Sequence, residues 1–331
     1  MTARRPKILL VTTKVDVTAD YVVLALEKRA ADFYRLNTED LPEAVKSSFE
    51  ISKDSAAWRW NCFEDEVELS DVRAVWFRRH RLPLLDAALD SGVRDFCLRE
   101  CDWFLRGALL ASNVRWMSFP PAVAAAEAKL FQLMVARDIG FTVPQTVFTN
   151  DGSKALAFAE ACGFLIAKSI RVGYIDDGAH GLEIFSNLIT AKDLREQEES
   201  IRLAPVIFQE FIDKAFDVRV TVVADQIFAA RIESQVVESA RIDWRRSDTD
   251  TLPHARMELP SDLALRCVDL VRRLGLEFGA IDFVVDRAER YYFLEINPNG
   301  QWAWLQDRLG FDIAGAIADW LLDAVEMSGG K

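Results

Sequence analysis

The chain has 331 residues, of which 50% are hydrophobic and 28% charged, which excludes a disordered protein and allows two or three packed domains. Its formal net charge of −12 argues against a nucleic-acid partner, because nucleic-acid binding needs a basic contact surface. No run of about 18 apolar residues could cross a membrane, and the N-terminal residues lack a signal-peptide core, so we expect a cytoplasmic protein with no membrane partner.

The first third of the sequence predicts an α/β domain, because strands and helices alternate along it. The expected elements are a strand at 7–13, a helix from Thr18 or Asp20 to about Ala31, strands at 33–36 and 72–77, and a helix from about 84 to 111. The sequence Phe119-Pro120-Pro121 then interrupts the pattern and marks the end of the domain.

The remaining sequence predicts mixed helices and strands. The expected elements are a helix at 122–139, a strand at 143–148, a helix at 153–161, a strand at 164–170, a helix at 191–201, strands at 206–212, 218–224 and 227–233, a helix at 262–274, a β-hairpin from 279 to 297, and a helix at 313–325. The stretch Arg171–Gly181 contains glycines and few apolar residues, which is typical of a mobile loop.

The C-terminal hairpin places two carboxylates opposite each other. If the four residues 287–290 form its turn, the facing pairs are Asp286 with Tyr291, Val284 with Phe293, and Asp282 with Glu295. Because side chains alternate between the faces of a strand, Asn297 shares the face of the two acids. The opposite face is apolar and can be buried; its members are Ile281, Phe283, Val285, Leu294 and Ile296.

The facing acids Asp282 and Glu295 need a positive charge between them, because like charges about 5 Å apart destabilise a sheet. A hard cation with oxygen ligands supplies this charge, and protein-bound Mg²⁺ is usually accompanied by phosphate. We therefore predict a magnesium site formed by Asp282, Glu295 and Asn297. The alternative is that both acids are ordinary solvent-facing hairpin residues without a metal.

A nucleotide at this site would have to be held by side chains. The sequence contains neither a GxxxxGK[ST] motif nor a GxGxxG motif after its first strand. The candidate cations are Lys129 on a predicted helix, Lys168 on an apolar strand, Arg219 in the sequence Asp217-Val218-Arg219, and Arg231 on the following strand. Together with three oxygen ligands, these residues are sufficient for a triphosphate and Mg²⁺. For each lysine alone, a side chain that snorkels to solvent is the competing explanation.

Other common catalytic or metal-binding patterns are missing. The five cysteines include no CxxC pair, the three histidines are far apart, and no GxSxG motif occurs. Cys97 and Cys101 are four residues apart, but no further ligand lies nearby to complete a zinc site. We therefore expect inert thiols and no nucleophilic catalysis by the protein.

The stretch Phe293–Trp304, which follows Asp282 in the sequence, carries a resemblance to the ATP-grasp superfamily. More specifically, it resembles the ligases that macrocyclise ribosomally made peptides, the microviridin-type or graspetide synthetases. This stretch is the most specific part of the resemblance, and it reads Phe293-Leu294-Glu295-Ile296-Asn297-Pro298-Asn299-Gly300-Gln301-Trp302-Ala303-Trp304. The segments Val75–Arg79 and Ile242–Arg245 are similar to the same subfamily. The resemblance extends from the N-terminal strand to Asp319.

This resemblance implies an ATP-grasp fold that combines the α/β and α+β classes. An N-terminal α/β pre-ATP-grasp domain at 1–118 would precede two α+β subdomains, at 119–205 and 206–331, that grip ATP between them. The implied cofactors are ATP and Mg²⁺, and a homodimer would fit the family.

The resemblance also implies a role for each candidate residue. Lys129 and Lys168 would contact the phosphates, and Lys168 would also reach the adenine. The segment Gln209, Glu210, Phe211 and Ile212 would form the hinge whose backbone reads the adenine edge, with Phe293 as a further nucleotide contact. Asp217 and Arg219 match a catalytic D-x-R motif with Arg219 on a phosphate, and Arg231 would meet the transferred phosphoryl group. Asp282, Glu295 and Asn297 match the metal positions.

The implied substrate is a ribosomal precursor peptide with a leader and an acidic core. ATP would phosphorylate its Asp or Glu side chains, and a Ser, Thr or Lys side chain of the same peptide would then attack to form an ester or amide. In such phosphoryl transfer the protein mainly positions groups and neutralises charge. The Arg171–Gly181 loop would close as a lid that excludes water. The candidate peptide-binding residues are Arg78, Arg79, Arg241, Asp243 and Arg245, for which solvated loop arginines are the competing explanation.

Two other functions stay open. A ligase that joins a free amino acid or small amine to a carboxylate uses the same nucleotide chemistry, with a different acceptor. A non-catalytic ATP-binding regulator is less consistent with three retained metal ligands.

Overall fold

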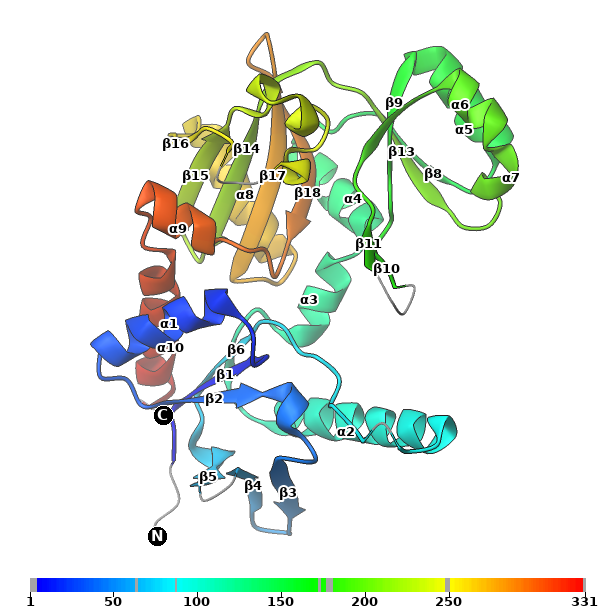
Figure 1. The fold of residues 1–331 in the computed structure, drawn as a ribbon. Helices are drawn as coiled ribbons and strands as arrows, with labels where there is room; N and C mark the ends of the chain where they lie inside the picture. Colours follow the sequence, from blue (N-terminus) through cyan, green and yellow to red (C-terminus); the bar gives the residue numbers. More distant parts are fainter. Residues whose placement is uncertain are drawn as a thin grey trace. The chain divides into compact units, whose positions relative to one another are not determined.

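The structure is a computed structural model that describes residues 5–62, 65–86, 88–171, 174–176, 181–247 and 251–329 (Figure 1). The chain divides into two compact units. The first comprises Met1–Pro120, Gln301–Gln306 and Asp312–Lys331, and the second comprises Pro121–Gly300 and Asp307–Phe311. Among the described helices, none has the length and apolar character needed to cross a membrane.

The first unit is built on a parallel sheet with the strand order β2-β1-β6-β7. Its strands are β1 (Ile8–Thr12), β2 (Phe33–Asn37), β6 (Ala74–Phe77) and β7 (Arg115–Met117). Helices α1 (Val17–Lys28) and α2 (Ser91–Ala111) connect the strands, so the predicted α/β character is confirmed. A small antiparallel sheet of β3 (Val45–Ile51), β4 (Ala56–Cys62) and β5 (Asp65–Glu68) was not anticipated.

The C-terminal helix α10 (Ile313–Gly329) belongs to the first unit, whereas we had placed it in a subdomain spanning 206–331. It lies beside α1, and the Asp319 carboxylate accepts a hydrogen bond from Arg29 Nε at 2.6 Å (Figure 1). Its buried side chains include Ile317 and Leu321. The short helix α9 (Ala303–Leu309) precedes it in the sequence. The chain therefore returns to its first unit after completing the second.

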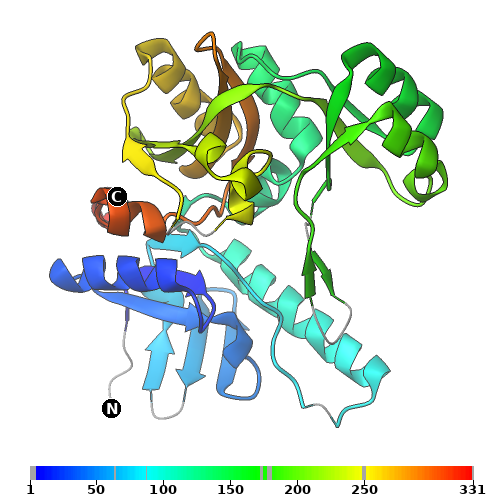
Figure 2. The same ribbon diagram turned by 45° about the horizontal axis from the view of Figure 1, so that its top comes forward.

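One half of the second unit is an antiparallel sheet with the order β12-β9-β13-β8. Its strands are β8 (Thr146–Thr149), β9 (Phe164–Lys168), β12 (Asn187–Thr190) and β13 (Val206–Glu210). Helices α5 (Gly152–Cys162), α6 (Ala191–Glu196) and α7 (Glu198–Ile201) cover one face of the sheet (Figure 2). Because β13 completes this sheet, the subdomain extends beyond the boundary that we had placed at residue 205.

The other half is an antiparallel sheet with the order β16-β15-β14-β17-β18. Its strands are β14 (Lys214–Val223), β15 (Gln226–Ile232), β16 (His254–Arg256), β17 (Phe278–Asp286) and β18 (Tyr291–Asn297). Helices α3 (Pro120–Ala126), α4 (Lys129–Ile139) and α8 (Ser261–Arg273) pack on its apolar face. The predicted helix at 122–139 is therefore interrupted at Glu127 and Ala128, and Lys129 begins α4.

The predicted mobile loop Arg171–Gly181 is only partly described. Residues 172–173 and 177–180 lie outside the described part of the chain. Strands β10 (Tyr174–Asp176) and β11 (Gly181–Glu183) form a short antiparallel pair in this region. The role of the loop as a lid stays a prediction.

The β17–β18 hairpin confirms the pairing of Asp282 with Glu295 and corrects the register nearer the turn. The turn has one residue fewer than expected, because the Asp286 N–H donates to the Arg290 carbonyl at 3.1 Å. Tyr291 consequently faces Val285, Tyr292 faces Val284, and Phe293 faces Phe283. A β-bulge then adds Leu294 to β18 and brings Glu295 opposite Asp282. A shorter turn and an unexpected bulge had opposite effects on the register, so they cancelled at the two acids.

Candidate active site

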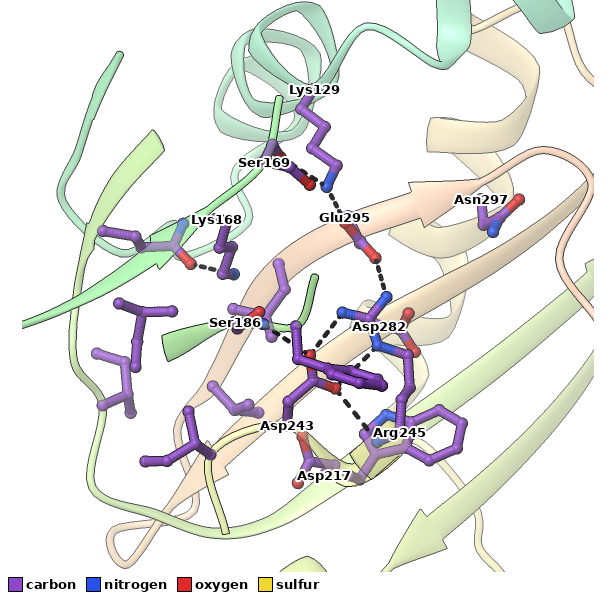
Figure 3. A pocket seen from close by; sticks show the side chains of 18 of the residues that line it. Lys129, Lys168, Ser169, Ser186, Asp217, Asp243, Arg245, Asp282, Glu295 and Asn297 are labelled. Carbon is purple, nitrogen blue, oxygen red and sulfur yellow. Dashed lines mark hydrogen bonds and ion pairs between the residues drawn. The ribbon is translucent and has the colours of Figure 1, made fainter. Parts of the chain in front are cut away.

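A cavity of about 400 Å³ lies in the second unit, and residues of its four-stranded and five-stranded sheets line it (Figure 3). Strands β9 and β13 contribute from one sheet, and β14, β17 and β18 from the other. The start of α4 and the loops around residues 184–186 and 241–245 complete the lining. This volume is in the usual range of small-molecule sites.

The opposed acids Asp282 and Glu295 line this cavity and are surrounded by cations (Figure 3). Arg219 donates a hydrogen bond to Asp282 Oδ2 at 2.6 Å. Lys129 Nζ lies 3.1 Å from one oxygen of Glu295, and an Arg245 nitrogen lies 3.8 Å from the other. In this structure, therefore, the positive charge that the facing acids require comes from three side chains.

The two acids differ in how readily they ionise. Burial raises the pKa of Asp282, and the neighbouring Glu295 raises it further, whereas Arg219 lowers it. Burial also disfavours the charged form of Glu295, but Lys129 and Arg245 outweigh it and hold the pKa of Glu295 well below its usual value. Glu295 is thus held as a carboxylate at neutral pH.

The predicted metal ligands fit Mg²⁺ in type, although only two of them are acids. Asp282 Oδ1 is buried and has no hydrogen-bond partner among the described residues, an arrangement that a bound cation would satisfy. Asn297 also lines the cavity, and its Oδ1 accepts a hydrogen bond from the Asn299 N–H at 3.0 Å. Across the described ranges, no group of three His, Cys, Asp or Glu side chains could hold a metal. Two carboxylates and an amide would therefore need phosphate oxygens or water to complete a hard-cation site.

Both predicted lysines reach the cavity. Lys168 Nζ donates to Gln209 Oε1 at 2.7 Å, and Lys129 Nζ donates to the Ser169 carbonyl at 3.3 Å. Burial lowers the pKa of Lys168 to about 8. Because the ammonium of Lys168 is costly in this environment, a polyphosphate beside it would stabilise its charged form.

The predicted hinge lines the cavity with two polar and two apolar residues. Residues Gln209 to Ile212 all line it, with Ile166 and Leu294 on the neighbouring strands. The Glu210 N–H donates to the Gln145 carbonyl at 2.8 Å, and the Phe211 N–H donates to the Phe164 carbonyl at 3.2 Å. These two N–H groups are therefore already used within the protein, and recognition of a base edge would fall to the other hinge groups.

Phe293 does not lie where we expected a nucleotide contact. Its side chain is fully buried in the hydrophobic core, where its ring centroid lies 5.5 Å from that of Phe141 and 5.9 Å from that of Phe283. The bulge in β18 explains the error, because it turns Phe293 to the core face and Leu294 to the cavity face.

Arg231 lies on the wrong face of the sheet for the predicted phosphoryl contact. It pairs with Val218, whose side chain belongs to the core, whereas Arg219 shares the face of Asp282. The Arg231 guanidinium lies 3.8 Å from the centroid of the Phe216 ring and 2.5 Å from a Glu233 oxygen. In this structure Arg231 packs on the edge of the core and does not line the cavity.

Asp217 lines the cavity, but its carboxylate is engaged by protein groups. Lys214 Nζ lies 2.7 Å from Asp217 Oδ2, and the Ser234 hydroxyl donates to the same oxygen. Burial raises the pKa of Asp217, and Lys214 lowers it. Lys214 also donates to the Ile242 carbonyl at 3.3 Å. The contacts of Asp217 therefore support the segment that carries Asp243, and they do not leave it open to substrate.

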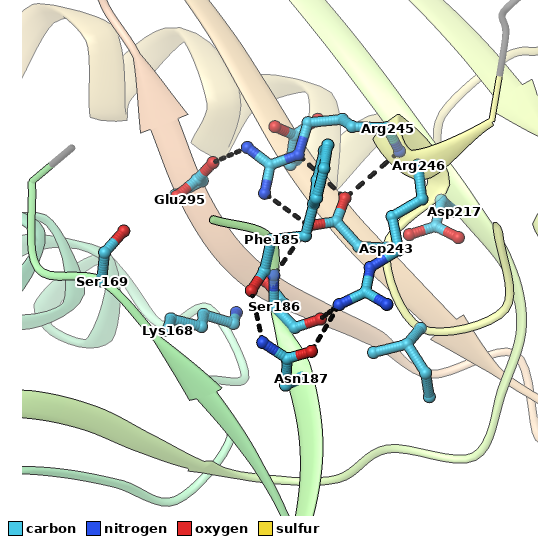
Figure 4. Close-up of polar contacts among 12 residues, drawn as sticks. Lys168, Ser169, Phe185, Ser186, Asn187, Asp217, Asp243, Arg245, Arg246 and Glu295 are labelled. Atoms are coloured by element: carbon cyan, nitrogen blue, oxygen red, sulfur yellow. Dashed lines mark hydrogen bonds and ion pairs between the residues drawn. The ribbon is translucent and has the colours of Figure 1, made fainter. Parts of the chain in front are cut away.

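Asp243 and Arg245 form a polar wall of the cavity across from Lys168 (Figure 4). Arg245 donates to both Asp243 oxygens, at 2.8 and 2.7 Å. The same carboxylate accepts a hydrogen bond from the Ser186 N–H at 3.2 Å, while Arg246 donates to the Ser186 carbonyl at 2.8 Å. Two loops distant in sequence are thereby joined, and Arg245 is held between Asp243 and Glu295. Arg241 also lines the cavity, and its side chain is exposed.

Arg78 and Arg79 have different environments, although we predicted both as peptide contacts. The Arg78 side chain is 1% exposed, and its Nε lies 2.9 Å from an Asp16 oxygen that is also buried. Arg78 therefore stabilises the first unit and is not accessible to a peptide. Arg79 is exposed.

Several residues at the cavity were missed from the sequence. They are Gln132, Ser186 and Lys214, which line it, and Ser234, which contacts the cavity residue Asp217. Gln132 follows Lys129 by one helical turn and so lies on the same helix face, which was an available signal. Ser186 and Ser234 act through loop conformations that no residue pattern indicates.

Comparison with known families agrees with this geometry. Residues 7–122 match the MvdD pre-ATP grasp domain, and residues 124–321 match the RimK-like ATP-grasp domain. A comparison with curated proteins found no match.

Solved structures with the same fold include several peptide-associated ligases. A RiPP-associated ATP-grasp ligase from Chryseobacterium gregarium, solved with ADP and a leader and core peptide, is 28% identical, covers 96% of this chain and 97% of its own, and has a TM-score of 0.89. Macrocyclase MdnC from Microcystis aeruginosa MRC, bound with precursor peptide MdnA, is 30% identical over 96% of this chain and 99% of its own, with a TM-score of 0.85. PsnB with a minimal precursor, Mg and ADP is 26% identical over 97% and 98%, with a TM-score of 0.76.

The match to the RimK-like ATP-grasp domain covers more than half of the chain. It includes every cavity residue described above. The predicted fold, a pre-ATP-grasp domain followed by an ATP-grasp domain, is confirmed. The chain belongs to the RimK-like ATP-grasp family and is an ATP-dependent ligase.

Proposed function

We propose that this ligase phosphorylates Asp or Glu side chains of a ribosomal precursor peptide and joins them to Ser, Thr or Lys side chains of the same peptide. The observation that carries the proposal is the pair Asp282 and Glu295, opposed in a cavity whose walls present Lys129, Lys168 and Arg245. The relatives solved with precursor, leader or core peptides support a peptide as the acceptor.

The chemistry requires a leaving group on the carboxylate. Transfer of the γ-phosphoryl group of ATP to the carboxylate gives an acyl phosphate and ADP. Attack by a hydroxyl or amine of the peptide then forms an ester or amide and releases phosphate and a proton. The protein contributes by positioning the groups and by neutralising charge, which suits a cavity lined by lysines, arginines and acids.

The residues at the cavity would divide this work. Lys129 and Lys168 would bind the phosphates of ATP, and Asp282, Glu295 and Asn297 would hold Mg²⁺, which neutralises phosphate charge when bound. PsnB, a relative with the same fold, was solved with Mg and ADP, which supports this assignment. Since Lys129 and Arg245 contact Glu295 in this structure, they would have to share that carboxylate with the metal.

The acidic core of the peptide would contact the basic residues that the structure leaves accessible. Arg241 and Arg245 line the cavity, and Arg79 is exposed on the first unit. Asp243 would act indirectly, because it holds Arg245. The buried Arg78 is not part of this surface.

We further propose that the ligase acts in the cytoplasm as a homodimer. Helix α2 supports the dimer, because the exposed side chains of Phe96, Trp103 and Leu110 recur at seven-residue spacing along one face. A second copy could cover this stripe. Light scattering of the Trp103→Glu variant should give a monomer where the wild type gives a dimer, and identical masses would contradict this interface.

The test of the proposed function is a reaction with purified components. A neighbouring short reading frame that encodes a peptide rich in Thr, Ser, Asp and Glu would supply the substrate. Incubation with the enzyme, ATP and Mg²⁺ should lower the peptide mass by one water per crosslink and form ADP. Glu295→Gln should abolish the mass change, whereas Glu50→Gln, which alters an exposed acid on the first unit, should not.

Two outcomes would contradict the proposal. If a free amino acid or amine in the mixture adds its own residue mass to the peptide, the protein is an amine ligase with an external acceptor. If nucleotide binds but no ADP forms with any acidic peptide, an acidic peptide is not the substrate and the proposed function is wrong.

A further inference from the structure

Gln132 is a buried glutamine on α4 with no role in the reaction described above. Only 2% of its surface is exposed, and it lies one helical turn after Lys129. Its side chain reaches β18, which is the edge strand of the five-stranded sheet. A buried amide is costly unless its donors and acceptor are all satisfied, so its contacts indicate what it supports.

This amide donates both of its N–H groups and accepts one hydrogen bond, and these three bonds go to two residues. Gln132 Nε2 donates to the Ala126 carbonyl at 2.5 Å and to the Ile296 carbonyl at 2.8 Å. Gln132 Oε1 accepts from the Ile296 N–H at 3.1 Å. The opposite amide orientation would place the side-chain NH2 group against the Ile296 N–H and the side-chain oxygen against the carbonyls of Ala126 and Ile296, so the contacts fix the orientation.

These hydrogen bonds hold the peptide groups of Ile296, which lies beside two of the proposed metal ligands. Ile296 lies between Glu295 and Asn297, and its side chain is buried in the core. An edge strand has no neighbour to satisfy its outer N–H and C=O groups. Gln132 bonds both of these groups of Ile296, as a neighbouring strand would. It thereby restrains the backbone on which the two ligands are carried.

Helix α4 therefore contacts the ligand strand twice within one turn. Lys129 bonds to the Glu295 carboxylate, and Gln132 bonds to the adjacent peptide groups. The third bond, to the Ala126 carbonyl, ties the end of α3 to the same amide at the point where the predicted continuous helix is interrupted. The interruption thus brings the start of α4 against β18.

We infer that Gln132 is a positioning residue for the Mg²⁺ ligands Glu295 and Asn297. The inference rests on the proposed metal site. Groups that orient metal ligands from outside typically change metal affinity by about 10–100-fold when they are removed. Removing the Gln132 amide should therefore raise the Mg²⁺ concentration that nucleotide binding requires. It should not change the affinity for nucleotide without metal, which depends on the lysines.

The experiment measures ADP binding to the full-length protein by calorimetry across a range of Mg²⁺ concentrations. Gln132→Met has a similar size and no amide, and Gln132→Asn keeps an amide that is one methylene too short. Each variant should raise the Mg²⁺ concentration for half-maximal ADP binding by about 10–100-fold. Binding of ADP in a chelator should change less than about twofold.

A matched control separates positioning from loss of packing. Leu133 packs against the core from the same helix and makes none of these hydrogen bonds to Ile296. Leu133→Ala should lower the free energy of unfolding without changing the Mg²⁺ dependence. If it shifts the Mg²⁺ dependence as much as Gln132→Met does, the positioning role is overturned.

Hydrogen exchange in the nucleotide-free protein gives a readout that is independent of the reaction. The Ile296 amide should exchange faster in Gln132→Met than in the wild type or Leu133→Ala, because its acceptor is lost. If Gln132→Met leaves the exchange of the Ile296 amide or the Mg²⁺ dependence of ADP binding unchanged, the positioning role of Gln132 is overturned. The proposed metal site is not affected by that result. A wild-type protein whose ADP binding ignores Mg²⁺ overturns the proposed metal site, and with it the inference.

Discussion

Lys168 is the residue whose charge state the cavity changes most clearly. Burial lowers its pKa to about 8, so the side chain is mostly neutral at about pH 8.5 in the free protein. A bound polyphosphate favours the ammonium form and raises this pKa. We therefore expect Lys168 to take up at most about three quarters of a proton per nucleotide when ADP binds at about pH 8.5, and to take up none at about pH 6.5, where it is already charged.

Calorimetry in buffers of different ionisation enthalpy measures this proton uptake. The heat at about pH 8.5 should depend on the buffer in the wild type and not in Lys168→Met. Lys129→Met removes a second phosphate contact but leaves Lys168 in place, so weakened binding should still show buffer dependence. Heats that do not depend on buffer at about pH 8.5 in the wild type would rule out a neutral Lys168.

The two arginines on neighbouring strands should respond differently to substitution. Arg219 holds the metal-binding Asp282, whereas Arg231 packs on Phe216 on the other face. Arg219→Lys keeps the charge but loses the planar fork, and we expect a loss of about 10–100-fold in kcat. Arg231→Gln should leave kcat within about twofold and lower the free energy of unfolding by about 0.5–1 kcal/mol.

Steady-state ADP formation and urea unfolding measure the two effects. A large loss of kcat in Arg231→Gln with unchanged stability would contradict this assignment. It would support the original prediction that Arg231 contacts the transferred phosphoryl group. The structure gives the reason for the different position of Arg231. Ala224 and Asp225 alone form the turn between β14 and β15, and a two-residue turn fixes Arg231 opposite Val218.

At the scale of single elements, alternation predicted which acids face each other but could not reveal the bulge. Side chains of β17 and β18 alternate with a constant period of two only while no residue is inserted in either strand. The turn length and the bulge both depend on local backbone conformation, including a positive φ of 59° at Glu289. Leu294 and Phe293 are both apolar, so residue type alone does not indicate which of them lies in the cavity and which in the core.

Because of the bulge, substitutions of the adjacent residues Phe293 and Leu294 should have different effects, one on stability and the other on ADP binding. Phe293→Ala removes a fully buried ring and should lower the free energy of unfolding by about 3–5 kcal/mol, with little change in the ADP affinity of the folded fraction. Leu294→Ala removes part of the apolar cavity wall, so it should weaken ADP binding with a smaller loss of stability. Denaturant unfolding and calorimetry on both variants test this, and the reverse pattern would show that Phe293 faces the nucleotide.

For the chain as a whole, alternation of strands and helices predicted the α/β character of the first unit and the order of most elements. It could not predict which unit the last helix joins. The apolar stripe of α10 fits any exposed sheet or helix face, and its partner α1 lies nearly three hundred residues earlier, with Arg29 and Asp319 in contact. The assignment of β13 was missed for a similar reason, because strand order depends on pairing between distant segments.

The return of α10 to the first unit predicts where a C-terminal truncation will act. Deletion of residues 312–331 exposes the surface covered by Ile313, Ile317 and Leu321, all fully buried. Burial of each such side chain contributes about 1.5–3 kcal/mol, a large part of the 5–15 kcal/mol by which a typical domain is stable. Hydrogen exchange and limited proteolysis should therefore show loss of protection within residues 5–120, with 121–300 less affected. Deletion after Met327 keeps these three side chains and should resemble the full chain, whereas protection lost mainly in 206–300 would place α10 with the second unit.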